Sequence, residues 1–189
     1  METGELVKEF SSGIAIRSET ALRTVLQQKN SLQEIEKIVE HRDPEVRWWA
    51  TRALASLDQE DAGPLLAKKL RDPDLAVRQC AALALSHRPL ASAAPELIEA
   101  LKDEDSLLKR LASEALVKIG SEATLALIEI LNSGDRATQV EAARALALIG
   151  DTRAVPALFR LAESDSVVLQ HWASEGLEKI GIGMSFFIP

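Results

Sequence analysis

The chain of 189 residues carries 29 acidic and 22 basic residues, and its formal net charge of −7 argues against a nucleic-acid backbone as its main ligand. Leucine and alanine dominate, tyrosine is absent, and only nine glycines and seven prolines occur, which favours helices over a β architecture. A single cysteine excludes an internal disulfide, and no apolar run approaches the roughly 20 residues that span a bilayer, so we expect no membrane partner.

The amino-terminal segment, residues 1–30, has neither the basic start nor the apolar centre of a secretion signal, so we expect a cytoplasmic protein. It contains IRSETALRTVLQQ, which resembles one helix of the repeats that follow but lacks their alanine and leucine spacing. We interpret residues 1–30 as an atypical helical cap of the kind that repeat arrays need.

Residues 31–181 repeat one pattern about every thirty residues. The anchor of this pattern is a leucine that returns in steps of 31, 31, 30 and 31 residues, at Leu54, Leu85, Leu116, Leu146 and Leu177. An alanine stands four positions before each anchor, and a shorter amphipathic stretch lies between the anchors, often opened by a proline such as Pro64 or Pro95. Each period therefore predicts two helices, here called A and B, without any linker that would divide the domain.

The ends of the predicted B helices have their own chemistry. A side chain that can cap a helix stands before each B helix, at Asp43, Asp74, Asp105, Asp135 and Ser166. We interpret this column as caps and not as metal ligands, since no ligand cluster accompanies it. Glycines suited to a helix carboxyl end follow three of the helices, at Gly120, Gly150 and Gly181. Basic residues inside the first turn, Arg47, Arg78 and Lys109, are expected to pair with carboxylates of adjacent turns.

The tail, residues 182–189, is apolar and contributes Ile182, Met184, Phe186, Phe187 and Ile188. The last repeat of a helical array has an uncovered apolar flank, so we expect the tail to fold back over it as a lid. The alternative is a peptide that binds a partner.

The stretches DPDLAVRQCAALAL and GDTRAVPALFRLAESD resemble the short HEAT-like repeats named after phycobilisome lyases, in which an Asp-rich turn, a Val-Arg pair and an Ala-x-x-x-Leu core recur. The resemblance implies an all-α fold, a curved α-solenoid of about five helix pairs whose B helices line the concave surface. It leaves the function open, because such repeats occur in bilin lyase subunits, in phycobilisome-degradation proteins, in a di-iron hydroxylase and in bacterial adaptors.

The stretch VRWWATRAL places two of the three tryptophans side by side. Neighbouring residues of a helix point about 100° apart, so one helix face cannot bury both centrally. The column of Trp49 also holds Cys80, Leu111 and Trp172 and is apolar in four repeats of five, with Glu141 as the exception. We therefore predict that Trp49, Cys80 and Trp172 pack in the core and that Trp48 faces out.

The outward line of the B helices is the predicted partner-binding surface. Its candidate contacts are Trp48, Thr51, Gln79, Arg110, Val140, Ala143 and His171. One column within this line is uniformly small, at Thr51, Ala82, Ser113, Ala143 and Ser174. Such a column either lets neighbouring B helices approach closely or forms the floor of a groove, and the sequence leaves both open.

Catalytic patterns are sparse. The histidines His41, His87 and His171 are not followed by glutamate, so the His-Glu pairs of the di-iron hydroxylase are missing, and no phosphate loop or CxxC pair occurs. We expect no catalytic, cofactor or metal site and interpret the protein as a non-catalytic scaffold or adaptor for a protein segment. The acidic balance suggests a neutral or basic partner. The alternative is a chromophore-handling protein similar to bilin lyase subunits.

Overall fold

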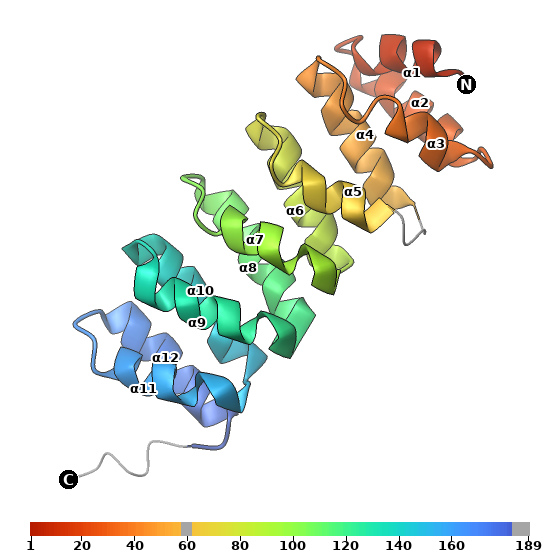
Figure 1. The fold of residues 1–189 in the computed structure, drawn as a ribbon. Helices are drawn as coiled ribbons and strands as arrows, with labels where there is room; N and C mark the ends of the chain where they lie inside the picture. The colour runs from red at the N-terminus through yellow and green to blue at the C-terminus, as the bar shows by residue number, and fades with distance from the viewer. Residues whose placement is uncertain (58–61, 183–189) are drawn as a thin grey trace. The chain divides into compact units, whose positions relative to one another are not determined.

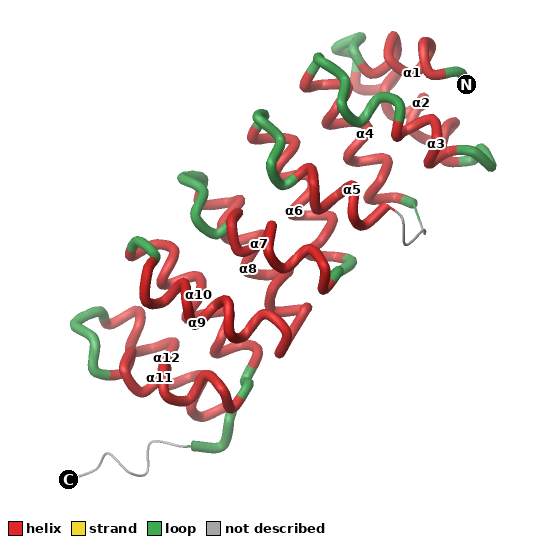
Figure 2. The backbone as a smooth tube through the Cα atoms, viewed as in Figure 1, coloured by secondary structure: helices red, strands yellow, loops and turns green. Residues whose placement is uncertain are grey.

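The computed structural model describes residues 1–57 and 62–182, and every regular element within them is a helix (Figures 1 and 2). None of the helices in this part of the chain is long and apolar enough to cross a membrane. The chain forms two compact units, Met1–Leu85 and Ser86–Pro189. This division was not predicted from the sequence, and the predicted boundaries at residues 30 and 181 stay predictions.

The first unit is built from helix pairs: α1 (Thr3–Phe10) with α2 (Ala15–Leu26), α3 (Ser31–Glu36) with α4 (Pro44–Ser56), and α5 (Ala62–Lys69) followed by α6 (Leu75–His87). Helix α4 is central in this unit because it contacts α1, α2, α3 and α5. Leu6 and Phe10 of α1 are fully buried together with Leu54 of α4. The amino-terminal helices therefore share one apolar core with the first repeat.

The second unit repeats the same plan: α7 (Ala94–Ala100) with α8 (Ser106–Ile119), α9 (Thr124–Ser133) with α10 (Arg136–Ile149), and α11 (Val155–Ala162) with α12 (Val167–Lys179). A short 3₁₀ turn leads into each A helix, at Ala91–Ala93, Gly120–Ala123 and Thr152–Ala154. Helix α10 packs against α8, α9 and α12. The predicted pairing of A and B helices is confirmed.

The predicted caps are confirmed at four of the five B helices. The Asp43 carboxylate accepts a hydrogen bond from the Glu45 amide, and Asp74 accepts one from the Ala76 amide. Asp105 and Asp135 each accept one from the amide three residues later, at 2.7 Å. The Ser166 side chain makes no capping hydrogen bond, so the prediction is wrong there.

The glycines after α8, α10 and α12 have φ of 81°, 72° and 87°, a region that side chains rarely adopt. At the end of α12 the Ile182 amide donates to the Leu177 carbonyl at 2.8 Å and the Gly181 amide donates to the Glu178 carbonyl. These two bonds close the helix in a Schellman motif. Residues 183–189 lie outside the described residues, so the predicted role of the tail as a lid stays a prediction.

Candidate partner-binding surfaces

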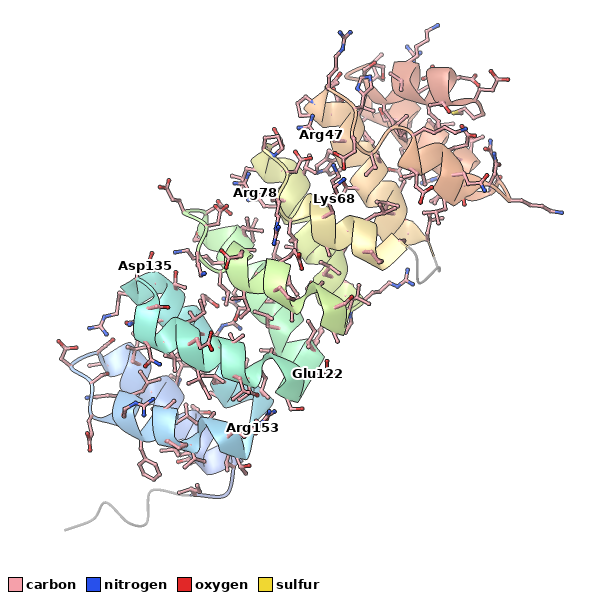
Figure 3. The ribbon with its side chains drawn as sticks, in the orientation of Figure 1. Arg47, Lys68, Arg78, Glu122, Asp135 and Arg153 are labelled. Atoms are coloured by element: carbon pink, nitrogen blue, oxygen red, sulfur yellow. The ribbon has the colours of Figure 1, made fainter. Side chains whose placement is uncertain are left out.

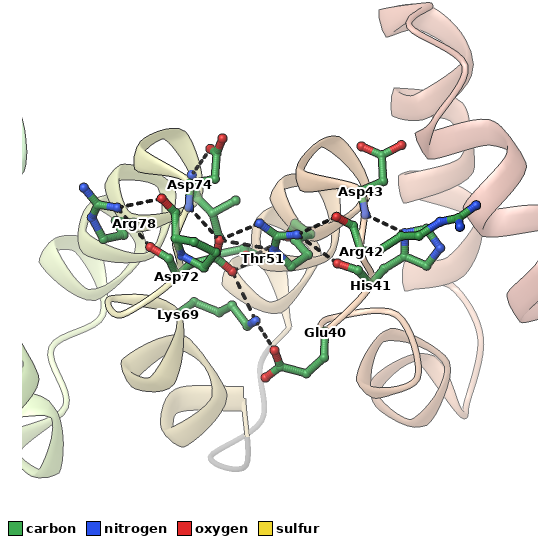
Figure 4. Close-up of polar contacts among 12 residues, drawn as sticks. Glu40, His41, Arg42, Asp43, Thr51, Lys69, Asp72, Asp74 and Arg78 are labelled. Carbon is green, nitrogen blue, oxygen red and sulfur yellow. Dashed lines mark hydrogen bonds and ion pairs between the residues drawn. The ribbon is translucent and has the colours of Figure 1, made fainter.

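A buried polar network holds the turns of the first unit together (Figure 4). The Arg47 guanidinium donates to the Asp72 carboxylate through Nε and Nη2, both at 2.9 Å, and through Nη1 to the carbonyls of His41 and Arg42. Lys69 Nζ lies 3.4 Å from the same carboxylate. The predicted pairing of Arg47 with a carboxylate of the neighbouring turn is confirmed.

The charge state of Asp72 follows from these contacts. Burial opposes its ionisation, but the hydrogen bonds from Arg47 and from the Asp74 amide outweigh this cost and hold the pKa of Asp72 below its ordinary value. The bond to Asp72 in turn raises the pKa of Arg47. Both groups are therefore engaged in structure and are not poised for proton transfer.

The equivalent position in the second unit uses lysine. Lys109 Nζ lies 3.5 Å from an Asp135 carboxylate oxygen and donates to the Thr138 hydroxyl at 3.2 Å. That hydroxyl donates in turn to the Leu101 carbonyl at 3.0 Å. Thr138 stands where the other repeats carry valine or leucine. The predicted ion pair of Lys109 is confirmed, and the hydroxyl of Thr138 gives the buried ammonium a second acceptor.

An aromatic cluster lies on α4 in the first unit. Trp49 is only 6% exposed and stacks on Phe10 with ring centroids 5.8 Å apart, so its predicted place in the core is confirmed. Trp48 is half-buried and meets Trp49 edge-on. The Arg52 guanidinium lies 5.6 Å and 5.1 Å from the Trp48 and Trp49 rings and pairs with Glu19. Trp48 therefore offers a partner only part of its ring.

Two other members of the Trp49 column are less buried than expected, whereas Leu111 is buried as predicted. Cys80 and Trp172 are both partly exposed. Burial nevertheless raises the pKa of the Cys80 thiol to about 11, although the charge of Arg52 acts in the opposite direction. Such a thiol is largely protonated at neutral pH, which fits a packing residue better than a nucleophile.

Three predicted contacts come together in the second unit. Arg110 of α8 and His171 of α12 are exposed, and Val140 of α10 is partly exposed. They occupy equivalent positions on consecutive B helices, and α10 packs against both α8 and α12. Arg110 also pairs with Glu114 at 2.9 Å, and the His171 ring lies 5.1 Å from the Trp172 ring. In the first unit, Gln79 of α6 is partly exposed.

Thr51 and Ala143 are fully buried, so they are not part of the exposed surface, and their prediction as partner contacts is wrong. The Thr51 hydroxyl donates to the Arg47 carbonyl within its own helix. In the second unit the buried Ser113 of α8 donates from its hydroxyl to the Glu141 carbonyl of α10 at 3.1 Å. Of the two alternatives for the small column, close approach of neighbouring helices therefore holds for α8 and α10.

The sequence interpretation missed an apolar row at the first turns of three B helices. Its members occupy equivalent positions and are all exposed: Leu107 of α8, Ala137 of α10 and Val168 of α12. We call them the first-turn row. The same position holds Glu45 and the exposed Ala76 in the first unit, so a repeat-by-repeat comparison of this column could have revealed that only the first repeat carries a charge there. Within residues 1–57 and 62–182, no group of three or more potential ligands could hold a metal ion.

The repeat character is also visible in comparisons with known proteins. The sequence pattern of HEAT repeats matches residues 14–86, 63–129 and 124–183. The chain belongs to the HEAT-repeat family. No curated protein matches it at a significant level.

Solved structures share the fold. A HEAT-like repeats protein from the archaeon Thermococcus onnurineus NA1 matches 95% of this chain and 80% of its own with a TM-score of 0.66 and 18% identity. The CpcE–CpcF complex of phycocyanin lyase from Nostoc sp. PCC7120 matches with a TM-score of 0.58 and 17% identity, over 76% and 96% of the two chains. A designed armadillo repeat protein in complex with the peptide (KR)4 matches with a TM-score of 0.55 and 21% identity, over 95% of this chain and 99% of its own. The predicted all-α solenoid class is confirmed.

Proposed function

We propose that this HEAT-repeat protein is a non-catalytic scaffold that binds a protein segment on the exposed surface of its B helices. The observation that carries the proposal is the row formed by Arg110, Val140 and His171 on the neighbouring helices α8, α10 and α12. An aliphatic centre flanked by a guanidinium and an imidazole offers both burial and hydrogen bonding to a partner. Arginine and aromatic side chains are frequent anchors of protein interfaces.

The first unit contributes its own candidate contacts, Trp48 and Gln79, both partly exposed. The Trp48 ring is already held by Trp49 and Arg52, so a partner would find it in one orientation and at a small entropic cost. The designed armadillo repeat protein in complex with (KR)4 supports the general proposal, because it is a protein of similar fold that binds a peptide.

A second candidate function is the handling of an open-chain tetrapyrrole, which the likeness to the phycocyanin lyase complex supports. The two candidates differ in a simple observation. A chromophore-handling protein offered an open-chain tetrapyrrole acquires a visible absorbance band, whereas a protein-binding scaffold does not.

Affinity capture from native lysate tests the scaffold function. The wild type is compared with Val140→Asp, with the exposed double variant Arg110→Glu/His171→Asp, and with Leu125→Asp, which changes an exposed leucine of α9 and is the control. Thermal melting first establishes that each variant is folded. We expect the wild type and the control to retain one specific protein that the other variants lose. Equal retention by all four proteins would refute this surface, and turnover of a small molecule by the isolated chain would refute the non-catalytic role.

A further inference from the structure

We propose that the segment bound by the second unit is basic and amphipathic, with apolar side chains on the first-turn row and lysine or arginine facing acidic borders on both sides of it. This inference rests on the proposed function and names the chemistry of the partner. It follows from the row itself, from the charges around it and from the pairing of the nearby cations.

The first-turn row gives the apolar part of the site. Leu107 and Val168 are each 50% exposed, and Val167 beside the row is 78% exposed. Packed helices lie about 8–10 Å apart, so a row across α8, α10 and α12 extends over roughly 20 Å. Exposed aliphatic side chains aligned on three neighbouring helices are typical of a docking surface.

The outer border consists of carboxylates in the loops that lead into the B helices. Glu104, Asp135, Glu163 and Asp165 all lie there and are exposed, and the side chains of Asp135 and Asp165 are 64% and 88% exposed. Figure 3 shows Asp135 at this edge of the second unit, with Glu122 and Arg153 at the opposite edge. The loops thus place negative charge directly beside the first-turn row.

The inner border lies further along the same helices. Glu114 of α8 is partly exposed, and Glu175 and Glu178 of α12 are exposed. The equivalent residue of α10 is Arg144, whose side chain is only 10% exposed and pairs with Glu141 at 2.9 Å. Because that cation is buried and neutralised, the inner border presents carboxylates to a partner.

The cations near the row are engaged within the protein. Arg110 pairs with Glu114 and Arg136 pairs with Asp165. Lys109 is buried. Residues 86–189 hold 15 of the 29 acidic residues but 10 of the 22 basic ones, which gives this unit a formal charge of −5.

Two further cations close the ends of helices. Lys118 and Lys179 donate their ammonium protons to the carbonyls of Ser86 and Leu148. The ion pairs of Lys109, Arg110 and Arg136 also neutralise one carboxylate each. Glu104, Glu163, Glu175 and Glu178 are exposed and form no ion pair within the described residues, so the surface around the row keeps an excess of negative charge. A basic segment supplies the missing charge, whereas an acidic segment or a nucleic acid is repelled.

Fluorescence anisotropy with the full chain tests the proposal. Three labelled synthetic peptides of about 12 residues, enough for an extended segment to exceed the length of the row, combine leucine with lysine, with glutamate or with serine. We expect the lysine peptide to bind at least tenfold more tightly than the other two. Its affinity should also fall several-fold as salt is raised, because exposed charges are screened.

Matched variants locate the binding. Glu175→Lys/Glu178→Lys should weaken the binding of the lysine peptide at least tenfold and strengthen the binding of the glutamate peptide. Leu107→Ser/Val168→Ser should weaken the binding of the lysine peptide without changing the charge of the protein. The controls Glu129→Lys and Leu125→Ser alter exposed residues of α9 and should leave binding unchanged. All altered side chains are exposed, so unchanged melting temperatures are expected and are measured first.

The remaining outcomes overturn the proposal. Equal or tighter binding of the glutamate or serine peptide contradicts the partner class while leaving the scaffold function intact. Absence of binding by all three peptides also contradicts the partner class, and the capture experiment with Val140→Asp then decides separately whether the scaffold function stands. Self-association that Leu107→Ser/Val168→Ser abolishes would assign the row to a second copy of the chain.

Discussion

Trp48 meets Trp49 edge-on, with ring centroids 4.9 Å apart and ring planes at 90°. Trp49 extends into the core and stacks on Phe10, whereas Trp48 stays partly exposed and lies beside the Arg52 guanidinium. The two adjacent indoles therefore have different roles. Trp49 joins α4 to α1, whereas Trp48 packs against Trp49 and forms part of the surface.

This difference predicts unequal losses of stability. Trp49→Ala removes a large core side chain and should lower the free energy of unfolding by about 3–5 kcal/mol. Trp48→Ala should cost clearly less, since its ring is already partly in water. Urea denaturation of both variants measures the difference, and equal losses would contradict the assignment of Trp49 to the core.

The regular features of the fold were predictable because they depend on local or repeated chemistry. The leucine and alanine columns predicted the helix pairs, and Asp43 was recognised as a cap because its carboxylate lies close to the amides of the next turn. The pairing of Arg47 with a carboxylate was predictable in kind, since a buried guanidinium needs an acceptor. The sequence did not reveal that Asp72 would be that acceptor.

Features that depend on distances between helices were not predictable. A small residue such as Ala143 fits a groove floor and a close helix contact equally well, and only the packing of α10 decided between them. Thr138 interrupts an aliphatic column, and its role emerged from the neighbouring Lys109. The apolar residues of the first-turn row could be read from a repeat-by-repeat comparison of their column, but their exposure depends on how the preceding loop runs.

The ion pair of Arg47 and Asp72 should make the first unit sensitive to acid. The folded-state pKa of Asp72 is depressed, so its contribution to stability is fully present above the unfolded pKa of about 3.9. It is lost as the pH falls below that value through the folded-state pKa. Asp72→Asn should therefore cost about 3 kcal/mol at neutral pH and reduce the loss of stability that occurs as the pH falls below about 4.

Asp43→Asn is the matched control for Asp72→Asn. It makes the same chemical change at a partly exposed cap, and asparagine caps a helix about as well as aspartate does. Urea denaturation at several pH values should show little change for this control. A pH dependence of Asp72→Asn that equals that of the wild type would contradict the proposed role of the Asp72 carboxylate.

Cys80 should react slowly with alkylating reagents. A thiol with a pKa of about 11 is ionised to only about 0.1% at pH 8, and the thiolate is the reactive form. The alkylation rate of the folded protein should therefore keep rising with pH up to about 11. Mass spectrometry of timed samples gives the rate, and denatured protein serves as the control with an ordinary thiol. An alkylation rate that levels off near pH 8.5 in the folded protein would contradict the raised pKa of the Cys80 thiol.

Gly176 lies inside α12, where glycine ordinarily costs about 1 kcal/mol relative to alanine. A Cβ at this position would lie 2.8 Å from Leu158 Cδ1 of α11 and 3.0 Å from Ala147 Cα of α10. Leu158 can move its methyl group, but the backbone of α10 cannot move without disturbing its packing. Gly176→Ala should therefore destabilise the protein by about 1–3 kcal/mol, in spite of the better helix propensity of alanine.

Gly4→Ala provides the opposite case, because Gly4 lies in α1 and a Cβ there would meet nothing within 4 Å. This substitution should leave stability unchanged or raise it by up to about 1 kcal/mol. Thermal melting of the two variants separates packing from propensity, since both make the same change of residue within a helix. A higher melting temperature for Gly176→Ala would show that α10, α11 and α12 are less tightly packed than the distances indicate.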